Sequence, residues 1–215
     1  MKRLVLPRLY VILDAALLTV PDTECAQRLA DAGVRLIQYR NKAASSGELL
    51  ESSKRLSSQL TAQGVSFVVN DRADVAALAD ATGLHLGQQD LGVEEARAVI
   101  GAGKWVGVST HNLEQFERAA ATSADYLAVG PVFSTSSKAN PDPVVGIDFI
   151  RKVRALTDKP IVAIGGITLE RAAEVIRAGA DCAAVISDIL LAPDPGKRAR
   201  QFIDLLEAAD HAAVV

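Results

Sequence analysis

Short apolar runs alternate along the whole chain with longer segments in which apolar residues recur at helical spacing. The runs are rich in Val, Ile, Leu and Ala, which is typical of parallel strands that are buried on both faces. The pattern predicts strands at residues 9–13, 34–40, 65–70, 84–87, 104–109, 124–130, 160–166 and 181–187. It predicts a helix behind each of them, at residues 22–33, 46–64, 73–83, 93–103, 113–122, 148–156, 168–179 and 196–209.

Eight strand–helix units in 215 residues fit a single (β/α)8 TIM barrel of the α/β class, with residues 1–215 as one domain. No linker, low-complexity tract or change of composition divides the chain. The alternative is an open, doubly wound sheet. That fold usually has a G-x-G-x-x-G turn after its first strand, and no such turn follows residues 9–13.

Composition and charge exclude several classes of protein. Apolar residues make up 49% of the chain, which favours a packed core over disorder. The net charge of −3, with scattered Lys and Arg, gives no reason to expect nucleic acid as a partner. No run of about 18 apolar residues occurs, so we expect no membrane span. Cys25 and Cys182 have neither metal-type spacing nor a disulfide framework, which indicates buried thiols of a cytoplasmic protein.

Polar residues gather at the carboxyl ends of the predicted strands. In a (β/α)8 barrel these ends and the loops behind them carry the active site. The ends of the second, third and fifth strands supply Gln38, Tyr39, Arg40, Asn41, Lys42, Asn70, Asp71 and Ser109. The opposite ends of the strands show no comparable set. The sequence therefore predicts a site at one mouth of the barrel.

Two acidic residues, Asp71 and Asp90, follow the third and fourth strands. Because one strand–helix step separates them, we expect their carboxylates to lie side by side. Two carboxylates with room for water and substrate phosphate are what Mg²⁺ prefers. The alternative for Asp71 is a cap on the helix that begins near Ala73, because Asp is favoured at that position.

Three basic residues, Arg40, Lys42 and Lys138, are expected at the same mouth. Arg40 and Lys42 are two residues apart on an extended chain end, so both should point to the same side. Together with Mg²⁺ they could hold a polyphosphate. The alternative is a plain cluster of salt bridges with the two acids.

A second phosphate signal lies at the seventh and eighth strands. Gly165 and Gly166 would let backbone N–H groups approach an anion, and Ser187 would begin a short helix whose first N–H groups favour phosphate. The alternative for the glycines is a tight turn. The long loop after the sixth strand could cover the site; it carries Thr135, Ser136, Ser137 and Lys138. Its alternative is a surface insertion without function.

Three further residues have weaker signals. His111 follows the fifth strand and is either an acid or base or an ordinary polar residue at the rim. His85 lies inside the fourth strand, where packing or hydrogen bonding within the barrel is expected. Trp105, in the fifth strand, is expected in the core.

The strand-end motifs, taken together and in order, resemble those of the thiamine-phosphate synthase family. They are "QYRNK", "VNDR", "GLHLGQQD", "GVSTH", "DYLAVGPVFSTSSK", "AIGGI" and "AAVIS", and they span nearly the whole chain. The resemblance implies a transferase that joins 4-amino-5-hydroxymethyl-2-methylpyrimidine diphosphate to a thiazole phosphate. Thiamine phosphate and pyrophosphate are the products, and Mg²⁺ is the cofactor.

The resemblance also implies roles for individual residues. Mg²⁺ would be held by Asp71 and Asp90, and Arg40, Lys42 and Lys138 would be catalytic. The pyrimidine diphosphate would contact Gln38, Arg40, Lys42, Asn70, Ser109 and Lys138. The thiazole phosphate would contact Thr135, Ser137, Gly166, Ile186 and Ser187. Tyr39, Asn41 and Ser136 are included among the substrate-binding residues.

The chain departs from the family pattern at Asn41, where Glu is usual, and at Ser134 and Ser137, where Pro and Thr are usual. The missing Glu removes a negative charge near Arg40 and Lys42, so altered kinetics are expected. Two other functions stay open: a thiazole tautomerase on the same barrel, and a non-catalytic barrel that senses phosphate. The partners implied are small molecules; the sequence does not decide whether the chain forms a homo-oligomer.

Overall fold

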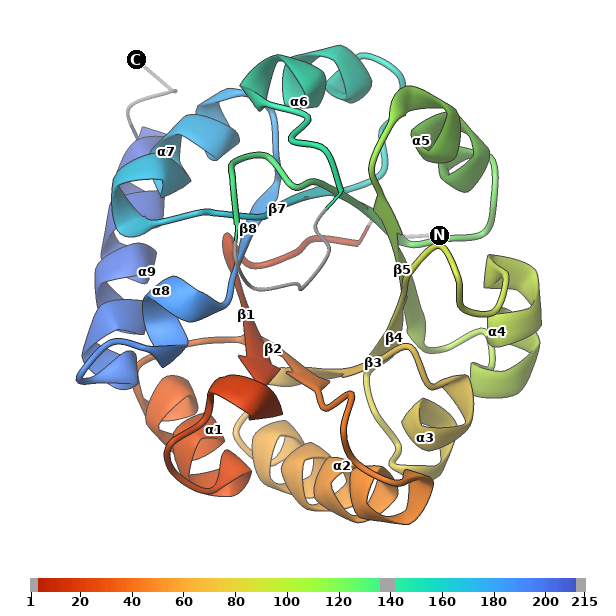
Figure 1. Ribbon diagram of the computed structural model, residues 1–215, viewed down its shortest axis with the longest axis vertical. Coiled ribbons are helices and arrows are strands. Elements are labelled where there is room, and N and C mark those ends of the chain that lie inside the picture. Colours follow the sequence, from red (N-terminus) through yellow and green to blue (C-terminus); the bar gives the residue numbers. More distant parts are fainter. Residues whose placement is uncertain (1–3, 136–141, 212–215) are drawn as a thin grey trace.

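The computed structural model describes residues 4–135 and 142–211, and its strands close into a parallel barrel in the order β1-β2-β3-β4-β5-β6-β7-β8. Helices surround the barrel (Figure 1). The strands are β1 Leu9–Asp14, β2 Leu36–Arg40, β3 Ser66–Asn70, β4 Gly83–Leu86, β5 Trp105–Thr110, β6 Tyr126–Val129, β7 Ile161–Ile164 and β8 Cys182–Val185. The predicted (β/α)8 barrel is confirmed, and the open sheet is excluded because β8 pairs with β1.

The helices follow the predicted pattern. They are α1 Asp22–Asp31, α2 Ser46–Thr61, α3 Ala73–Leu78, α4 Val93–Ile100, α5 Leu113–Ala120, α6 Ile147–Arg154, α7 Leu169–Arg177, α8 Ser187–Leu190 and α9 Pro195–His211. A 3-10 helix, η1 Ala15–Leu17, follows β1 and is capped by the side chain of Asp14. The sequence pattern did not predict η1. The short helix expected at Ser187 is α8.

Several elements end earlier than the apolar pattern predicts. The third helix stops at Leu78 because β4 already begins at Gly83, which leaves room for one short turn only. The seventh strand stops at Ile164 because Gly165 and Gly166 have φ angles of 99° and 63°, which lie in the left-handed region that ends a strand.

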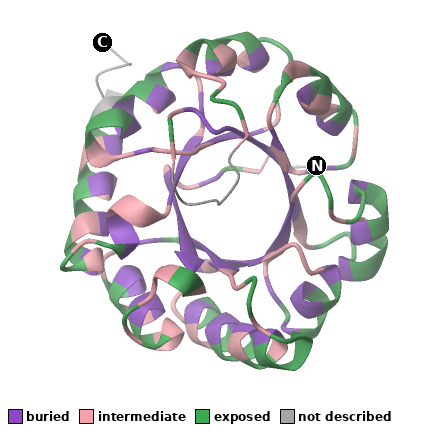
Figure 2. Ribbon diagram, viewed as in Figure 1, coloured by how far each residue is buried: buried purple, intermediate pink, exposed green. Residues whose placement is uncertain are grey.

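Apolar side chains form two clusters, one on each side of the barrel wall. The inner cluster includes Tyr10, Val68, Tyr126 and Cys182, and Trp105 packs against it, half-buried. The outer cluster lies between strands and helices and includes Cys25. Figure 2 shows the strands mostly buried, whereas the helices bury one face and expose the other. The prediction that both cysteines are buried is confirmed, since they are 2% and 0% exposed.

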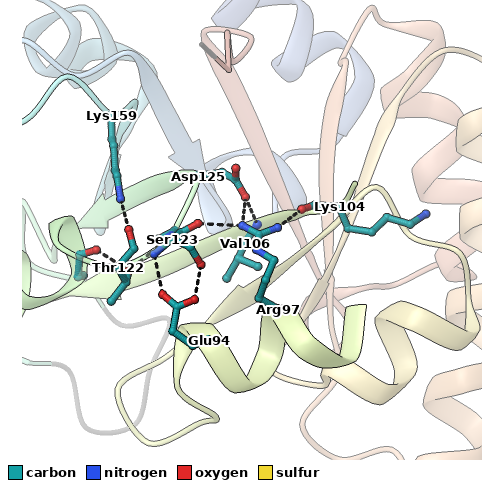
Figure 3. A network of polar contacts seen from close by, with 10 residues as sticks. Glu94, Arg97, Lys104, Val106, Thr122, Ser123, Asp125 and Lys159 are labelled. Atoms are coloured by element: carbon teal, nitrogen blue, oxygen red, sulfur yellow. Dashed lines mark hydrogen bonds and ion pairs between the residues drawn. The ribbon is translucent and has the colours of Figure 1, made fainter. Parts of the chain in front are cut away.

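A polar network joins the residues at the amino ends of β5 and β6 (Figure 3). The carboxylate of Asp125 accepts hydrogen bonds from the N–H of Val106, at 2.7 Å, and from Arg97, at 2.5 Å. Arg97 also donates to the carbonyl oxygens of Lys104 and Ser123. This network ties α4 to the loops before β5 and β6, on the side of the barrel opposite to the predicted site.

Among the described residues, no helix combines the length and apolar character that crossing a membrane requires.

Candidate active site

A cavity of about 650 Å³ opens at the carboxyl ends of the strands, and most of the predicted residues that the structure describes lie around it. Those that line it are Gln38, Arg40, Lys42, Asn70, Asp71, Asp90, Ser109, Thr135 and Ile186. They come from the ends of β2, β3, β5 and β8 and from the loops behind β3, β4 and β6. The predicted mouth of the barrel is therefore a real cavity.

Other predicted residues lie elsewhere. Tyr39 is buried in the outer cluster, between the barrel and the helices. Asn41 turns into the loop behind β2, where its Oδ1 accepts from the N–H groups of Ala43 and Ala44. Neither they nor Gly166 and Ser187 are among the described residues that line this cavity. Their roles as substrate contacts stay predictions.

Three predicted residues, Ser136, Ser137 and Lys138, lie outside the described part of the chain.

The two carboxylates are brought together as expected. Asp71 has a φ angle of 64° and forms an ion pair with Lys42. Asp90 accepts a hydrogen bond from the N–H of Gly87 at 2.7 Å. Burial raises the pKa of Asp90, and the hydrogen bond and negative charge of Asp71 raise it further, against the lowering effect of Gly87. Neighbouring carboxylates of like charge disfavour ionisation of one another, and a cation between them would relieve this.

Asp71 does not cap the following helix. The cap position of α3 is Arg72, and no side chain hydrogen bonds to the helix end there. The capping alternative is wrong because α3 begins at Ala73, as predicted, so the cap position falls on Arg72 and not on Asp71. The carboxylate of Asp71 is left to face Lys42 and the cavity.

Of the three predicted basic residues, the structure describes Arg40 and Lys42, and each forms an ion pair with an acid. Arg40 forms an ion pair with Asp14, which is 3% exposed and lies opposite it in the register of β1 and β2. Lys42 pairs with Asp71. The salt-bridge alternative, a cluster with Asp71 and Asp90, is therefore met among the described residues only by the pair of Lys42 with Asp71, because Arg40 pairs with Asp14 instead. Sequence reasoning missed Asp14 as part of this site, although its place at the end of β1 was a usable signal.

Gln38 is 2% exposed, and its Oε1 atom has no hydrogen-bond partner within the described chain. A buried acceptor without a partner is costly. Another part of the Gln38 side chain lines the cavity, so the residue borders the site.

The two described histidines that line the cavity are both fixed by hydrogen bonds. His85 bonds through both ring nitrogens, to Tyr126 and Ser109, as expected for a histidine inside the barrel. His111 Nδ1 lies 2.6 Å from the carbonyl oxygen of Gly130, and its Nε2 lies 3.4 Å from a carboxylate oxygen of Asp142.

The glycines after β7 are needed for close packing. A Cβ at Gly165 would overlap Pro131, and one at Gly166 would overlap the backbone of Ser134. The tight-turn alternative therefore holds, and it brings the loops behind β6 and β7 together. Gly165 lines the cavity.

Sequence reasoning missed other residues that line the cavity. They are Ile12, Gln88, Gln89, Gln115, Pro131, Asp142 and Ile164. Gln88 and Gln89 directly follow β4 and could have been found from that position alone. Gln115 and Asp142 come from a helix and a loop, so no strand-end rule would select them.

Fold and site together define a (β/α)8 barrel enzyme with a cavity lined by charged and polar side chains at its mouth. Residues 9–189 match the family described as thiamine monophosphate synthase. The chain belongs to this family and is a transferase.

Individual relatives point to the same family. The chain is 50% identical to the thiamine-phosphate synthase of Koribacter versatilis over 94% of this chain and 97% of the relative. It is 41% identical to that of Chloroflexus aurantiacus over 96% of each. The solved thiamine phosphate pyrophosphorylase of Pyrococcus furiosus superposes with a TM-score of 0.85 at 35% identity, over 94% of this chain and 96% of that one.

Proposed function

We propose that the chain is a thiamine-phosphate synthase. It joins 4-amino-5-hydroxymethyl-2-methylpyrimidine diphosphate to a thiazole (carboxy)phosphate and releases pyrophosphate. The observation that carries the proposal is the convergence of Gln38, Arg40, Lys42, Asp71 and Asp90 on one cavity in a member of this family.

The diphosphate group accounts for the charged side of the cavity. Arg40 and Lys42 are each held by an acid, Asp14 and Asp71, which fixes their direction before the substrate arrives. Preorganised cations stabilise the negative charge that grows on a leaving pyrophosphate, and such stabilisation is usually the largest single catalytic effect. We assign Arg40, Lys42 and Lys138 to this catalytic role.

The residues of the site fit Mg²⁺. The described residues contain no group of three or more His, Cys, Asp or Glu suited to a metal, so the protein would supply the two carboxylates of Asp71 and Asp90. Mg²⁺ is commonly held by one or two carboxylates, with water and substrate phosphate completing the shell. When bound, Mg²⁺ would neutralise charge on the pyrophosphate.

The uncharged side of the cavity accounts for the pyrimidine. The unpartnered Oε1 of Gln38 suits a donor such as the amino group of the pyrimidine. Ser109 and Asn70 line the same wall. The electron-rich aminopyrimidine stabilises the cation left when pyrophosphate departs, and the thiazole nitrogen attacks that cation. No serine or cysteine nucleophile is needed.

The thiazole phosphate is assigned to Thr135, Ser136 and Ser137 behind β6, with Gly166, Ile186 and Ser187 behind β7 and β8. Barrels often bind phosphate at the last two of these loops. Gly165 and Ile186 line the cavity, which supports a contact there. Tyr39 and Asn41 are retained as proposed members of the pyrimidine side, acting through the shape of the loop behind β2.

The partners of the reaction are small molecules, with neither nucleic acid nor membrane involved. We place the protein in the cytoplasm, as one domain over residues 1–215. Whether it forms a homo-oligomer is independent of the proposed chemistry.

The proposal is tested by measuring pyrophosphate release. Purified protein is mixed with the pyrimidine diphosphate, the thiazole phosphate, or both, with Mg²⁺ or with a chelator. Release that needs both substrates and Mg²⁺ is expected. Absence of release while thiazole phosphate still binds would contradict the proposal and favour a tautomerase or a phosphate-sensing barrel.

A further inference from the structure

Four side chains inside the barrel are joined by hydrogen bonds into a chain that ends at the cavity. Tyr10 Oη lies 3.2 Å from Tyr126 Oη, and Tyr126 Oη lies 3.1 Å from His85 Nδ1. His85 Nε2 lies 2.8 Å from Ser109 Oγ. Tyr10 and Tyr126 are almost fully buried, whereas His85, which is 6% exposed, and Ser109 line the cavity. The barrel interior is thus connected to the site by polar groups.

Gly107 makes room for this chain. His85, Gly107 and Tyr126 are partners in the register of β4, β5 and β6, so all three face the barrel interior. A Cβ at Gly107 would overlap the ring of Tyr126. Without that Cβ, the rings of Tyr126 and His85 stack with their centroids 5.6 Å apart and 23° between their planes. The glycine therefore lets a phenol on β6 reach an imidazole on β4.

The protons of the chain have two consistent arrangements, because a neutral imidazole carries one N–H. In the first, every group donates toward the cavity, so that His85 donates from Nε2 to Ser109. In the second, Ser109 donates to His85 Nε2, His85 donates from Nδ1 to Tyr126, and Tyr126 donates to Tyr10. The hydroxyl of Tyr10 then needs a further acceptor. The described residues offer Tyr10 no hydrogen-bond partner except Tyr126. Since a buried donor without an acceptor is costly, the first arrangement is favoured.

We propose that Tyr10, Tyr126 and His85 position Ser109 as a hydrogen-bond donor to an acceptor atom of the pyrimidine diphosphate. Ser109 accepts the N–H of His85, so its own proton points into the cavity. Burial raises the pKa of both tyrosines, which keeps the phenols protonated and able to donate. In this proposal Tyr10, Tyr126 and His85 are positioning residues, and their effect on the substrate through this chain is transmitted by Ser109. The inference rests on the proposed function, because that function supplies the ligand.

The proton arrangement is measured directly by ¹⁵N NMR of the histidine rings. The chain contains three histidines, so the signals can be assigned with His111→Gln and His211→Gln variants. We expect His85 to be neutral and protonated at Nε2 in the free protein, and Tyr126→Phe to convert it to a mixture of both tautomers. A wild-type His85 protonated at Nδ1 would overturn the inference. This readout does not depend on any activity.

The role of the chain in turnover is measured by a double-mutant cycle on Tyr126→Phe and Ser109→Ala. Loss of one hydrogen bond at Tyr126 should lower kcat roughly tenfold with little change in KM for the thiazole phosphate. If Tyr126 acts through Ser109, the double variant should match Ser109→Ala within about twofold. Multiplicative losses, or a Ser109→Ala variant with full activity, would overturn the inference.

The control is Ser57→Ala, which removes a buried hydroxyl that bonds to the carbonyl oxygen of Asp80, away from the cavity. It should leave kcat unchanged. If Tyr126→Phe fails to fold, Tyr10→Phe removes the first donor and enters the same cycle. A wild-type protein without pyrophosphate release would contradict the proposed function, while the NMR result would still decide the direction of the chain.

Discussion

Gln38 shows at the scale of one residue how binding and stability are opposed. Within the described part of the chain its Oε1 is buried without a partner, so the folded protein carries the cost of desolvating that atom. An apolar side chain of the same size would avoid this cost. Under the proposed function, a donor group of the pyrimidine would complete the amide.

Replacing Gln38 by Met, which has a similar volume, should therefore separate the two properties. We expect Tm to stay equal or to rise by a few degrees, about 1 kcal/mol for a chain of this size. The KM for the pyrimidine diphosphate should rise at least tenfold, roughly the value of one lost hydrogen bond. Thermal unfolding and steady-state kinetics measure both.

Gln27→Met is the matched control. Gln27 lies on α1, and its amide exchanges hydrogen bonds with Gln59 and Gln63. This variant should lose a little stability and keep its KM. If Gln38→Met lowered Tm as much as the control does and left KM unchanged, Gln38 would be a structural residue.

Asp71 is the second residue whose effect can be isolated. Its φ angle of 64° is tolerated by Asp and Asn but is strained for Ala, so Asp71→Asn is a cleaner change than Asp71→Ala. Asp71→Asn should lower Mg²⁺-dependent turnover on the order of a hundredfold, because it removes one metal ligand and the partner of Lys42. Pyrophosphate release is measured as a function of Mg²⁺ concentration.

Asp74→Asn serves as the control for that variant. Asp74 is an exposed acid on α3 that pairs with Arg72, and exposed pairs contribute little. It should leave turnover and its Mg²⁺ dependence unaltered. Unchanged Mg²⁺ dependence in Asp71→Asn would remove Asp71 from the proposed metal site.

At the scale of elements, three side chains at the amino ends of the strands accept hydrogen bonds from backbone N–H groups in the same way. The side chain of the residue just before β4, β6 or β8 accepts a hydrogen bond from the backbone N–H of a residue in the preceding strand. The pairs are Thr82 with Phe67, Asp125 with Val106, and Asp181 with Ile161. Strand N–H groups that the ladder leaves open are satisfied in this way. This repeat lies opposite to the cavity and concerns stability.

Asp125→Ala should accordingly destabilise the protein without changing its chemistry. The variant leaves the N–H of Val106 without its acceptor and removes the carboxylate partner of Arg97, which keeps its hydrogen bonds to the carbonyl oxygens of Lys104 and Ser123 (Figure 3). We expect a loss of about 2 kcal/mol in the free energy of unfolding and an unchanged kcat. Urea unfolding and pyrophosphate release measure the two effects.

Asp148→Ala tests the specificity of that result. Asp148 is almost fully exposed and pairs only with Arg151, three residues along α6. Its removal should change stability by less than about 0.5 kcal/mol. A lowered kcat in a folded Asp125→Ala protein would show that the two ends of the barrel are coupled.

At the scale of the whole molecule, closure of the barrel and its cover of helices exclude water from both cysteines. Burial raises the pKa of Cys25 to about 11 and also raises the pKa of Cys182. Both groups are therefore thiols at neutral pH, and the reactive thiolate is scarce.

An aromatic disulfide reagent at pH 8 should label neither cysteine in the folded protein and both in denaturant. The slow rate of labelling in the folded protein should rise with pH, because the fraction of reactive thiolate grows with pH. It should also follow the rate of global unfolding. Cys25→Ser and Cys182→Ser variants assign the two thiols. Rapid labelling of Cys182 under native conditions would mean that the barrel interior opens readily.

The sequence alone determined the number and order of the strands and the helices that alternate with them, although not the short η1. Apolar runs such as residues 65–70 and 160–166 are short and β-rich, and the segments between them have helical periodicity, so the (β/α)8 barrel followed. The strand-end rule then placed Gln38, Arg40, Asp71, Asp90 and Ser109 at one mouth, where the structure has them. Local pattern suffices here because strand ends in a parallel barrel meet by geometry.

Only the tertiary structure decided which side chains touch. The ion pair of Arg40 with Asp14 and the hydrogen bonds that run from Tyr10 to Ser109 join residues far apart in sequence. Packing also decided that Gln38 Oε1 has no hydrogen-bond partner among the described residues. The direction in which Tyr39 and Asn41 turn was likewise settled by packing. Such contacts depend on register between strands and on the space left by single glycines such as Gly107, which no periodicity in the sequence encodes.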